Sequence, residues 1–256
     1  MRAFVAALLL ALVPTALAGD YRNPTAGAVV ALQVPGMHLA KVKRNVLYKA
    51  GLALDVYRPA RASGRLPAVL FVHGTPRGSQ SPKADGVFVG WGQLAAASGL
   101  AGVTFDHQQD PADVEAAVRY VRRNAARLGI DGSRLCVAGF SAGVQLSMLP
   151  ALQRKLGALR CTVGYYGPLH AELDQLSPLA YVRKDAPPTL VAKAGRDNPA
   201  INRSIDRYIA RAKEVGARVE LVVQPTGPHG FETTKDAKSR AVMRRTLAFL
   251  REHLAR

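Results

Sequence analysis

The stretch Leu135-Cys136-Val137-Ala138-Gly139-Phe140-Ser141-Ala142-Gly143 decides the fold of this chain. Its first four residues form an apolar run typical of a strand that is covered on both faces. Residues 144–156 have the composition of a helix. A Gly-x-Ser-x-Gly motif between such a strand and a helix is typical of a nucleophile elbow, whose tight turn needs small neighbours. The motif predicts Ser141 as a nucleophile and the Ala142 backbone N–H, at the helix N-terminus, as a donor to an oxyanion.

The chain outward from this motif alternates between strand-like and helix-like segments. Amphipathic helices are expected after Asp113 as N-cap, over residues 201–215 and over residues 243–254. This alternation predicts an α/β fold, with a mostly parallel sheet covered by helices on both faces. Residues 19–44 are less regular and are expected to form either an antiparallel edge or a loose arm. The other expected strands are Leu52 to Tyr57, Ala68 to Val72, Gly102 to Phe105, Thr162 to Tyr166, Thr189 to Ala192 and Val219 to Val223.

A serine hydroxyl needs a base, and the base needs a carboxylate. His229 follows the last expected strand in a turn rich in glycine and proline, whereas His38 and His253 lie away from any strand end. Asp197 follows the strand Thr189 to Ala192, so Ser141, Asp197 and His229 occur in the order expected of this elbow. Two alternatives stay open for the acid: Asp197 could cap the next helix, and the loop residues Asp174 and Asp185 could replace it.

The loop after Val72 is expected to supply a second oxyanion donor. Gly74 allows close approach of the backbone, and the Thr75 N–H is the predicted donor because Pro76 has none. His73 is interpreted as a brace beneath this loop.

Several residues near strand ends are expected to line the pocket: His73, Gly74, His107 and Tyr166, together with Trp91. Trp91 lies near the end of the polar stretch 76–92, before a helix expected over Gln93 to Ala97. The alternative for Trp91 is that it anchors this helix in the core.

The first eighteen residues have the layout of a secretory signal peptide. Arg2 precedes an apolar run from Phe4 to Val13, and Ala16-Leu17-Ala18 suits cleavage. The run is shorter than the roughly 20 residues that span a bilayer, so no membrane-spanning segment is expected after cleavage. The expected organisation is a signal peptide over residues 1–18 and a single catalytic domain over residues 19–256.

The chain of 256 residues carries a formal net charge of +17, of which Arg2 accounts for one. The basic residues are spread over helix-like segments without a nucleic-acid-binding motif, so we expect an arginine-rich surface and no nucleic-acid partner. Attraction to anionic surfaces is the functional alternative. Cys136 and Cys161 lie in neighbouring core strands and are expected to be free and buried. No metal site or cofactor is expected.

These residues together resemble the α/β-hydrolase superfamily, in its small esterase/lipase and dienelactone-hydrolase-like branch. The resemblance rests on Leu54-Asp55-Val56-Tyr57-Arg58-Pro59, Val72-His73-Gly74, the elbow, Gly195-Arg196-Asp197 and His229-Gly230-Phe231, and it runs from about residue 45 to the C-terminus. Thr75 stands where many hormone-sensitive-lipase-like esterases have a third glycine, and Ser141 stands where dienelactone hydrolases have cysteine. The segment between Tyr166 and Pro188 is too short for a large helical lid.

The resemblance implies a serine carboxylesterase that acts on short-acyl or carbohydrate-linked esters through an acyl-enzyme, and the signal-like N-terminus adds the expectation that it is exported to the periplasm or the exterior. A serine peptidase of prolyl-oligopeptidase type shares the order of the triad and is one alternative. A non-catalytic, hydrolase-like protein that binds an envelope polymer through its basic surface is the other. The oligomeric state cannot be predicted from the sequence.

Overall fold

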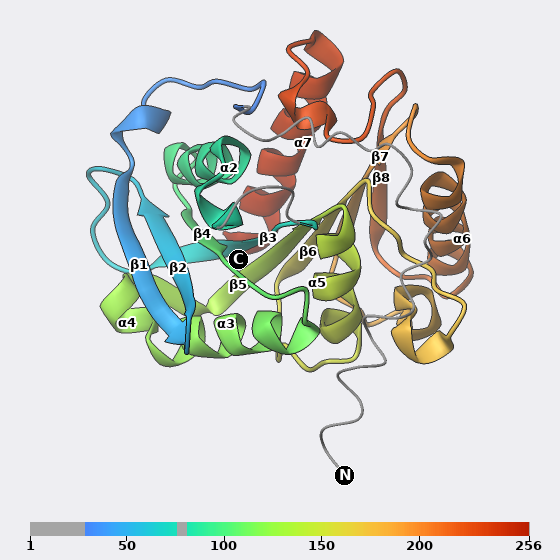
Figure 1. Cartoon of the computed structure of the whole chain (residues 1–256), viewed down its shortest axis with the longest axis horizontal. Coiled ribbons are helices and arrows are strands. Elements are labelled where there is room, and N and C mark those ends of the chain that lie inside the picture. Colours follow the sequence, from blue (N-terminus) through green and yellow to red (C-terminus); the bar gives the residue numbers. More distant parts are fainter. Residues whose placement is uncertain (1–28, 76–80, 256) are drawn as a thin grey trace.

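The computed structural model describes residues 29–75 and 81–255, so the predicted signal peptide and Pro76 lie outside the described residues. An eight-stranded sheet in the order β1-β2-β4-β3-β5-β6-β7-β8 forms the centre of the molecule (Figure 1). All neighbours pair in parallel except β1 with β2 and β2 with β4. The predicted fold class, a mostly parallel sheet with helices on both faces, is confirmed. The strands are β1 (Lys41–Lys49), β2 (Leu52–Arg58), β3 (Leu66–Val72), β4 (Ala101–Phe105), β5 (Ile130–Phe140), β6 (Cys161–Tyr165), β7 (Thr189–Ala194) and β8 (Val219–Gln224).

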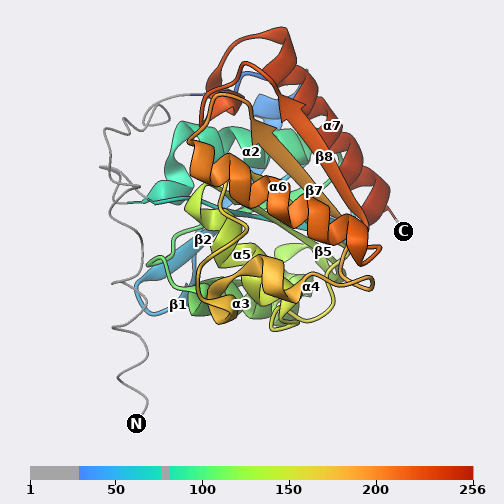
Figure 2. The ribbon, with the colours of Figure 1, turned by 90° about the vertical axis from the view of Figure 1, so that its right-hand side faces the viewer.

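Helices cover the two faces of the sheet in separate layers. One apolar cluster packs α2 and α7 against one face, and two further clusters pack α3, α5 and α6 against the other (Figures 1 and 2). Because both faces are covered, the central strands β4 and β6 are buried throughout. The α-helices are α2 (Gly86–Ala97), α3 (Pro111–Arg123), α4 (Ala125–Leu128), α5 (Ala142–Leu152), α6 (Pro199–Glu214) and α7 (Ala237–Leu254).

The less regular N-terminal stretch divides into an arm and an edge strand. Strand β1 is antiparallel to β2, which agrees with the expected antiparallel edge but places it mostly after residue 44. Val30 and Leu32 in the arm are buried against α2 and α7. Lysines at both ends of β1 and at Lys43 keep the outer edge charged, which discourages pairing with another chain.

Two expected helix starts were wrong. Helix α3 is capped by Asp110, whose side chain accepts from the Ala112 N–H, with Pro111 at the first helical position. Asp113 is instead buried inside the helix, where its carboxylate accepts from Lys49 Nζ at 2.5 Å. Helix α2 begins at Gly86, seven positions before the expected start at Gln93.

Trp91 therefore lies in the middle of a helix, and the prediction that it lines the pocket was wrong. Its side chain is fully buried and packs against Phe71, Phe140 and Tyr165, with ring centroids 5.5–5.8 Å apart. The alternative interpretation, a core anchor for the helix, describes its place.

The expectation of free cysteines was also wrong, because Cys136 and Cys161 form a disulfide. Strands β5 and β6 are parallel neighbours whose register sets the two residues directly opposite each other, with Cα atoms 4.9 Å apart. This separation lies within the range that a disulfide spans without backbone movement.

We predict that removing this disulfide destabilises the fold without changing it. A cross-link over 25 residues stabilises by about 3.5 kcal/mol in the loop-entropy account. The variant Cys136→Ala/Cys161→Ala should lose about this much free energy of unfolding in a denaturant titration, and it should not respond to reductant. The unsubstituted chain, refolded under reducing conditions, should show a matching loss. Two titratable thiols in the non-reduced, unfolded chain would contradict the disulfide.

Candidate active site

The turn at Ser141 joins β5 to α5 in a strained backbone conformation. Ser141 has φ 54° and ψ −126°, a region that residues with a side chain rarely occupy. Its N–H donates to the Tyr165 carbonyl at 3.0 Å, which fixes the turn to the neighbouring strand β6. At Gly143, a Cβ atom would lie 2.2 Å from the Val72 carbonyl oxygen, so only glycine allows α5 to approach β3 this closely. The turn therefore places the half-buried serine at the carboxyl edge of the sheet.

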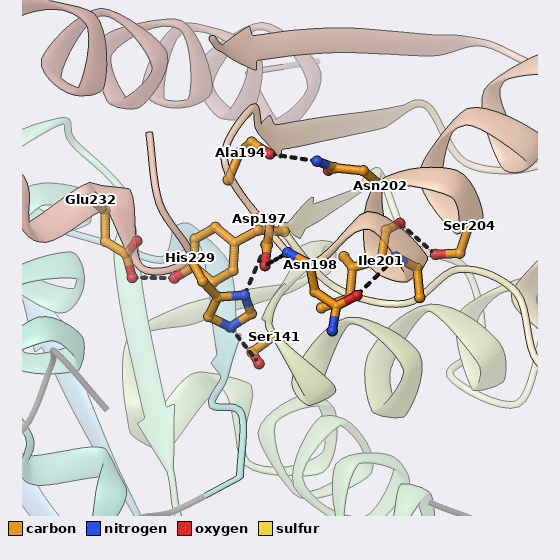
Figure 3. A network of polar contacts seen from close by, with 11 residues as sticks. Ser141, Ala194, Asp197, Asn198, Ile201, Asn202, Ser204, His229 and Glu232 are labelled. Carbon is orange, nitrogen blue, oxygen red and sulfur yellow. Dashed lines mark hydrogen bonds and ion pairs between the residues drawn. The ribbon is translucent and has the colours of Figure 1, made fainter. Parts of the chain in front are cut away.

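The structure brings Ser141, His229 and Asp197 into one line (Figure 3). The distance from His229 Nε2 to Ser141 Oγ is 2.8 Å, and His229 Nδ1 lies 2.8 Å from Asp197 Oδ2. A carboxylate accepts only, so Nδ1 carries the ring proton and Nε2 is free to accept from the serine hydroxyl. This tautomer is the one that a general base at Ser141 needs.

The two alternatives for the acid are resolved by the contacts. The N-cap of α6 is Asn198, whose side chain accepts from the Ala200 N–H, so Asp197 does not cap that helix. Asp185 pairs with Arg154 and Arg183 on the surface, and Asp174 begins a short 3-10 helix, Asp174–Leu176. Of the three carboxylates, Asp197 is the one that contacts His229.

Burial favours the uncharged forms of the histidine and its carboxylate partner. Burial lowers the pKa of His229 to about 4 and raises the pKa of Asp197 to about 6. The Asn198 N–H, which donates to Asp197, lowers the pKa of that carboxyl and so opposes part of the rise. The imidazole is consequently unprotonated at neutral pH, which is the state that accepts a proton from Ser141.

One predicted oxyanion donor follows Ser141 in the chain, and the loop before the other passes close to the serine. Ala142 is the first residue of α5, so its N–H has no acceptor within the helix. On the other side, a Cβ atom at Gly74 would lie 2.8 Å from Ser141 Cβ, which shows how closely the loop after β3 passes the serine. Thr75, the next residue, is exposed.

His73 and His107, both expected at the pocket, are buried beneath this loop. Their rings stack with centroids 3.7 Å apart, and burial lowers their pKa values to about 4 and about 3. His73 Nδ1 lies 2.7 Å from the Gly74 carbonyl oxygen, in agreement with the interpretation of His73 as a brace. Neither ring lines an open surface, so their expected place as pocket walls was wrong, whereas Gly74 does lie at the serine.

Tyr166, also expected at the pocket, lies behind His229 instead. The side chain is buried, its ring centroid is 4.5 Å from that of His229, and its hydroxyl donates to Glu232. Burial raises the pKa of Glu232 to about 7. Glu232 escaped the sequence analysis because it follows no strand end. Its spacing of three residues from His229 was the available signal.

Neither a metal centre nor a membrane span is found in the described part of the chain. Across residues 29–75 and 81–255, no group of three His, Cys, Asp or Glu side chains could hold a metal ion. Over the same residues, no helix is both long and apolar enough to cross a bilayer.

Comparison with known proteins places this geometry in a known fold. Residues 54–172 match the BD-FAE family model. A thermophilic esterase of Thermogutta terrifontis superposes with a TM-score of 0.70 at 23% identity, over 85% of this chain and 94% of that one. A truncated carbohydrate esterase from gut microbiota gives a TM-score of 0.68 at 19% identity, over 84% and 97%. The chain has the α/β-hydrolase fold.

A curated relative adds a sequence match. The probable 2-oxo-3-(5-oxofuran-2-ylidene)propanoate lactonase of Bradyrhizobium sp. is 29% identical over 160 residues, which cover 59% of this chain and 62% of the lactonase. The chain thus spans less than two thirds of that relative's length.

We predict that the His229 ring protonates only well below the ordinary imidazole pKa of 6.5. Burial disfavours the imidazolium, so the ring should stay neutral as the pH falls through 6.5 and should gain its proton near pH 4. An NMR titration of the ring Cε1–H checks this, with assignment from a His229→Gln variant. Protonation at or above pH 6.5 would contradict the assigned environment.

Proposed function

We propose that this protein is an exported serine carboxylesterase. The observation that carries the proposal is the continuous hydrogen-bonded line from Ser141 through His229 to Asp197, with 2.8 Å at each step. The fold, the match to the BD-FAE family model and the structural likeness to esterases support the same class of chemistry.

The proposed reaction begins when Ser141 Oγ attacks the ester carbonyl carbon. His229 Nε2 takes the serine proton, and Asp197 stabilises the imidazolium that results. The N–H groups of Ala142 and Thr75 donate to the oxyanion, and each such donor contributes on the order of 3 kcal/mol of transition-state stabilisation. The tetrahedral intermediate then expels the alcohol, which takes the proton from His229, and leaves an acyl group on Ser141. Water deprotonated by His229 attacks that acyl group and releases the acid.

The proposed substrates are short-acyl or carbohydrate-linked esters. The connection from β6 to β7 contains only two short 3-10 helices, Asp174–Leu176 and Pro178–Tyr181, rather than a helical lid. A site without such a cover suits an ester whose alcohol is bulky. The structural likeness to a carbohydrate esterase supports this class of substrate.

Export is the second part of the proposal. It is supported by the signal-like N-terminal sequence and by the disulfide between Cys136 and Cys161, a bond typical of oxidising compartments. On these two grounds we propose a periplasmic or extracellular location.

The two alternatives of different class are a peptidase of prolyl-oligopeptidase type and a non-catalytic protein that binds an envelope polymer. A peptidase could use the same triad with an amide substrate. The high positive charge favours the polymer-binding alternative, but binding needs no imidazole held between a serine and a carboxylate.

The first prediction of the proposal concerns Ser141. The Ser141→Ala variant should fold normally and should lose hydrolysis of p-nitrophenyl acetate on the order of 10⁴- to 10⁶-fold, because the nucleophile is gone. A fluorophosphonate probe should label the unsubstituted chain at Ser141 and leave the variant unlabelled. Full turnover by Ser141→Ala, or a folded chain that the probe does not label, would refute the esterase.

A second prediction separates the esterase from the peptidase. The esterase should hydrolyse p-nitrophenyl acetate far faster than a prolyl p-nitroanilide dipeptide, because the acyl group of an amide is less reactive than that of an ester. The ratio of the two kcat/KM values is the measurement. A ratio that favours the amide would replace the esterase with the peptidase.

A further inference from the structure

Gln109, in the segment between β4 and α3, contacts the loop that carries the second oxyanion donor. Its amide Nε2 donates to the Gly74 carbonyl oxygen at 3.2 Å. Gln109 is one of a few non-glycine residues with a left-handed backbone, at φ 59°. This conformation is sparsely populated and persists where the surroundings hold it.

The tautomers of the two stacked histidines follow from their acceptors. His73 Nδ1 faces the Gly74 carbonyl oxygen and His107 Nε2 faces the His73 carbonyl oxygen at 3.2 Å, so both nitrogens carry the proton because a carbonyl only accepts. Within the described residues, the remaining nitrogen of His73 is buried and has no hydrogen-bond partner. The remaining nitrogen of His107 accepts from the Gln109 N–H at 3.2 Å.

These contacts hold two consecutive carbonyl groups of the loop. The His73 carbonyl accepts from His107, and the Gly74 carbonyl accepts from both His73 and Gln109. A trans peptide is planar, with its C=O and N–H on opposite sides. Two donors on the Gly74 oxygen therefore fix the direction in which the Thr75 N–H points.

We infer that Gln109 is a positioning residue for the oxyanion donor of Thr75. This inference rests on the proposed esterase function. Gln109 touches no reacting atom. Its side-chain amide fixes the Gly74–Thr75 peptide. The backbone N–H of Gln109 donates in turn to His107, which holds Gln109 in place. Because His73 supplies the other donor to Gly74, loss of Gln109 should weaken the orientation rather than abolish it.

The test removes the amide donor and keeps the shape of the side chain. Gln109→Met should lower kcat for p-nitrophenyl acetate about tenfold, a fraction of the roughly 10²- to 10³-fold loss that follows removal of an oxyanion donor. KM should change less than about twofold, because the oxyanion forms only in the transition state. Gln109→Glu should lower kcat by at least the same factor, because an ionised carboxylate cannot donate a hydrogen bond. The matched control is Gln108→Met, since Gln108 is the exposed neighbour of the same residue type.

The decisive readout compares an ester with its thionoester analogue. Sulfur accepts hydrogen bonds only weakly, so the thionoester depends little on oxyanion donors. Gln109→Met should therefore slow the ester about tenfold and the thionoester much less, with rates normalised to the fraction of active sites that a fluorophosphonate titrates. Gln108→Met should leave the ratio of the two substrates unchanged.

The two possible failures are distinguishable. An equal fall for both substrates, or a higher KM with unchanged kcat, would show that Gln109 only supports the fold and would overturn the positioning role. An unsubstituted chain that hydrolyses neither substrate and is not labelled would overturn the esterase function as well.

Discussion

The strained turn at Ser141 is the constraint on which the rest of the site depends. A residue with a side chain accepts φ 54° only if its surroundings supply the missing energy, and here they do so from both sides. The Tyr165 carbonyl holds the Ser141 N–H from β6, and α5 packs through Gly143 onto the carbonyl oxygen of Val72 at the end of β3. Three adjacent parallel strands thus hold one turn. Since the same strands carry the loop after Val72 and Tyr166, the turn and its partners form one structural unit.

Burial is the second determinant of the site, because it sets the protonation of the groups around the serine. The pKa values of His73, His107 and His229 are lowered and those of Asp197 and Glu232 are raised, each with burial as the largest cause. Neutral histidines have one donor and one acceptor nitrogen, and this asymmetry makes them directional. A charged pair of imidazoles at 3.7 Å would repel and would present only donors. Burial therefore keeps these imidazoles neutral and directional, both at Ser141 and beneath the loop after Val72.

The sequence predicted the elements and the residues that lie at strand ends. Ser141 was found by its motif and its place between a strand and a helix, and Asp197 and His229 by their places after later strands in the expected order. The structure places the three within hydrogen-bonding distance. Contacts across strands were harder to predict, because they depend on register. Cys136 and Cys161 were assigned to neighbouring strands, but only the register shows that they lie opposite each other. Trp91 was misplaced for a different reason. The helix begins at Gly86, directly after its N-cap Asp85, inside the stretch 76–92 that was interpreted as a polar loop.

Gln109 and Glu232, which support the reactive groups, were not predicted from the sequence, and their places in the fold explain why. Gln109 follows β4 and acts on the Thr75 N–H indirectly, through a hydrogen bond to the Gly74 carbonyl oxygen. Any residue at position 74 would have such a carbonyl. The Glu232 carboxylate fixes the hydroxyl of Tyr166, whose ring packs against His229. Neither role depends on a motif; each depends on where a backbone carbonyl or an aromatic ring lies after folding. The loop after Val72 and the imidazole of His229 are thus contacted by different side chains, Gln109 at the loop and Tyr166, held by Glu232, at the imidazole.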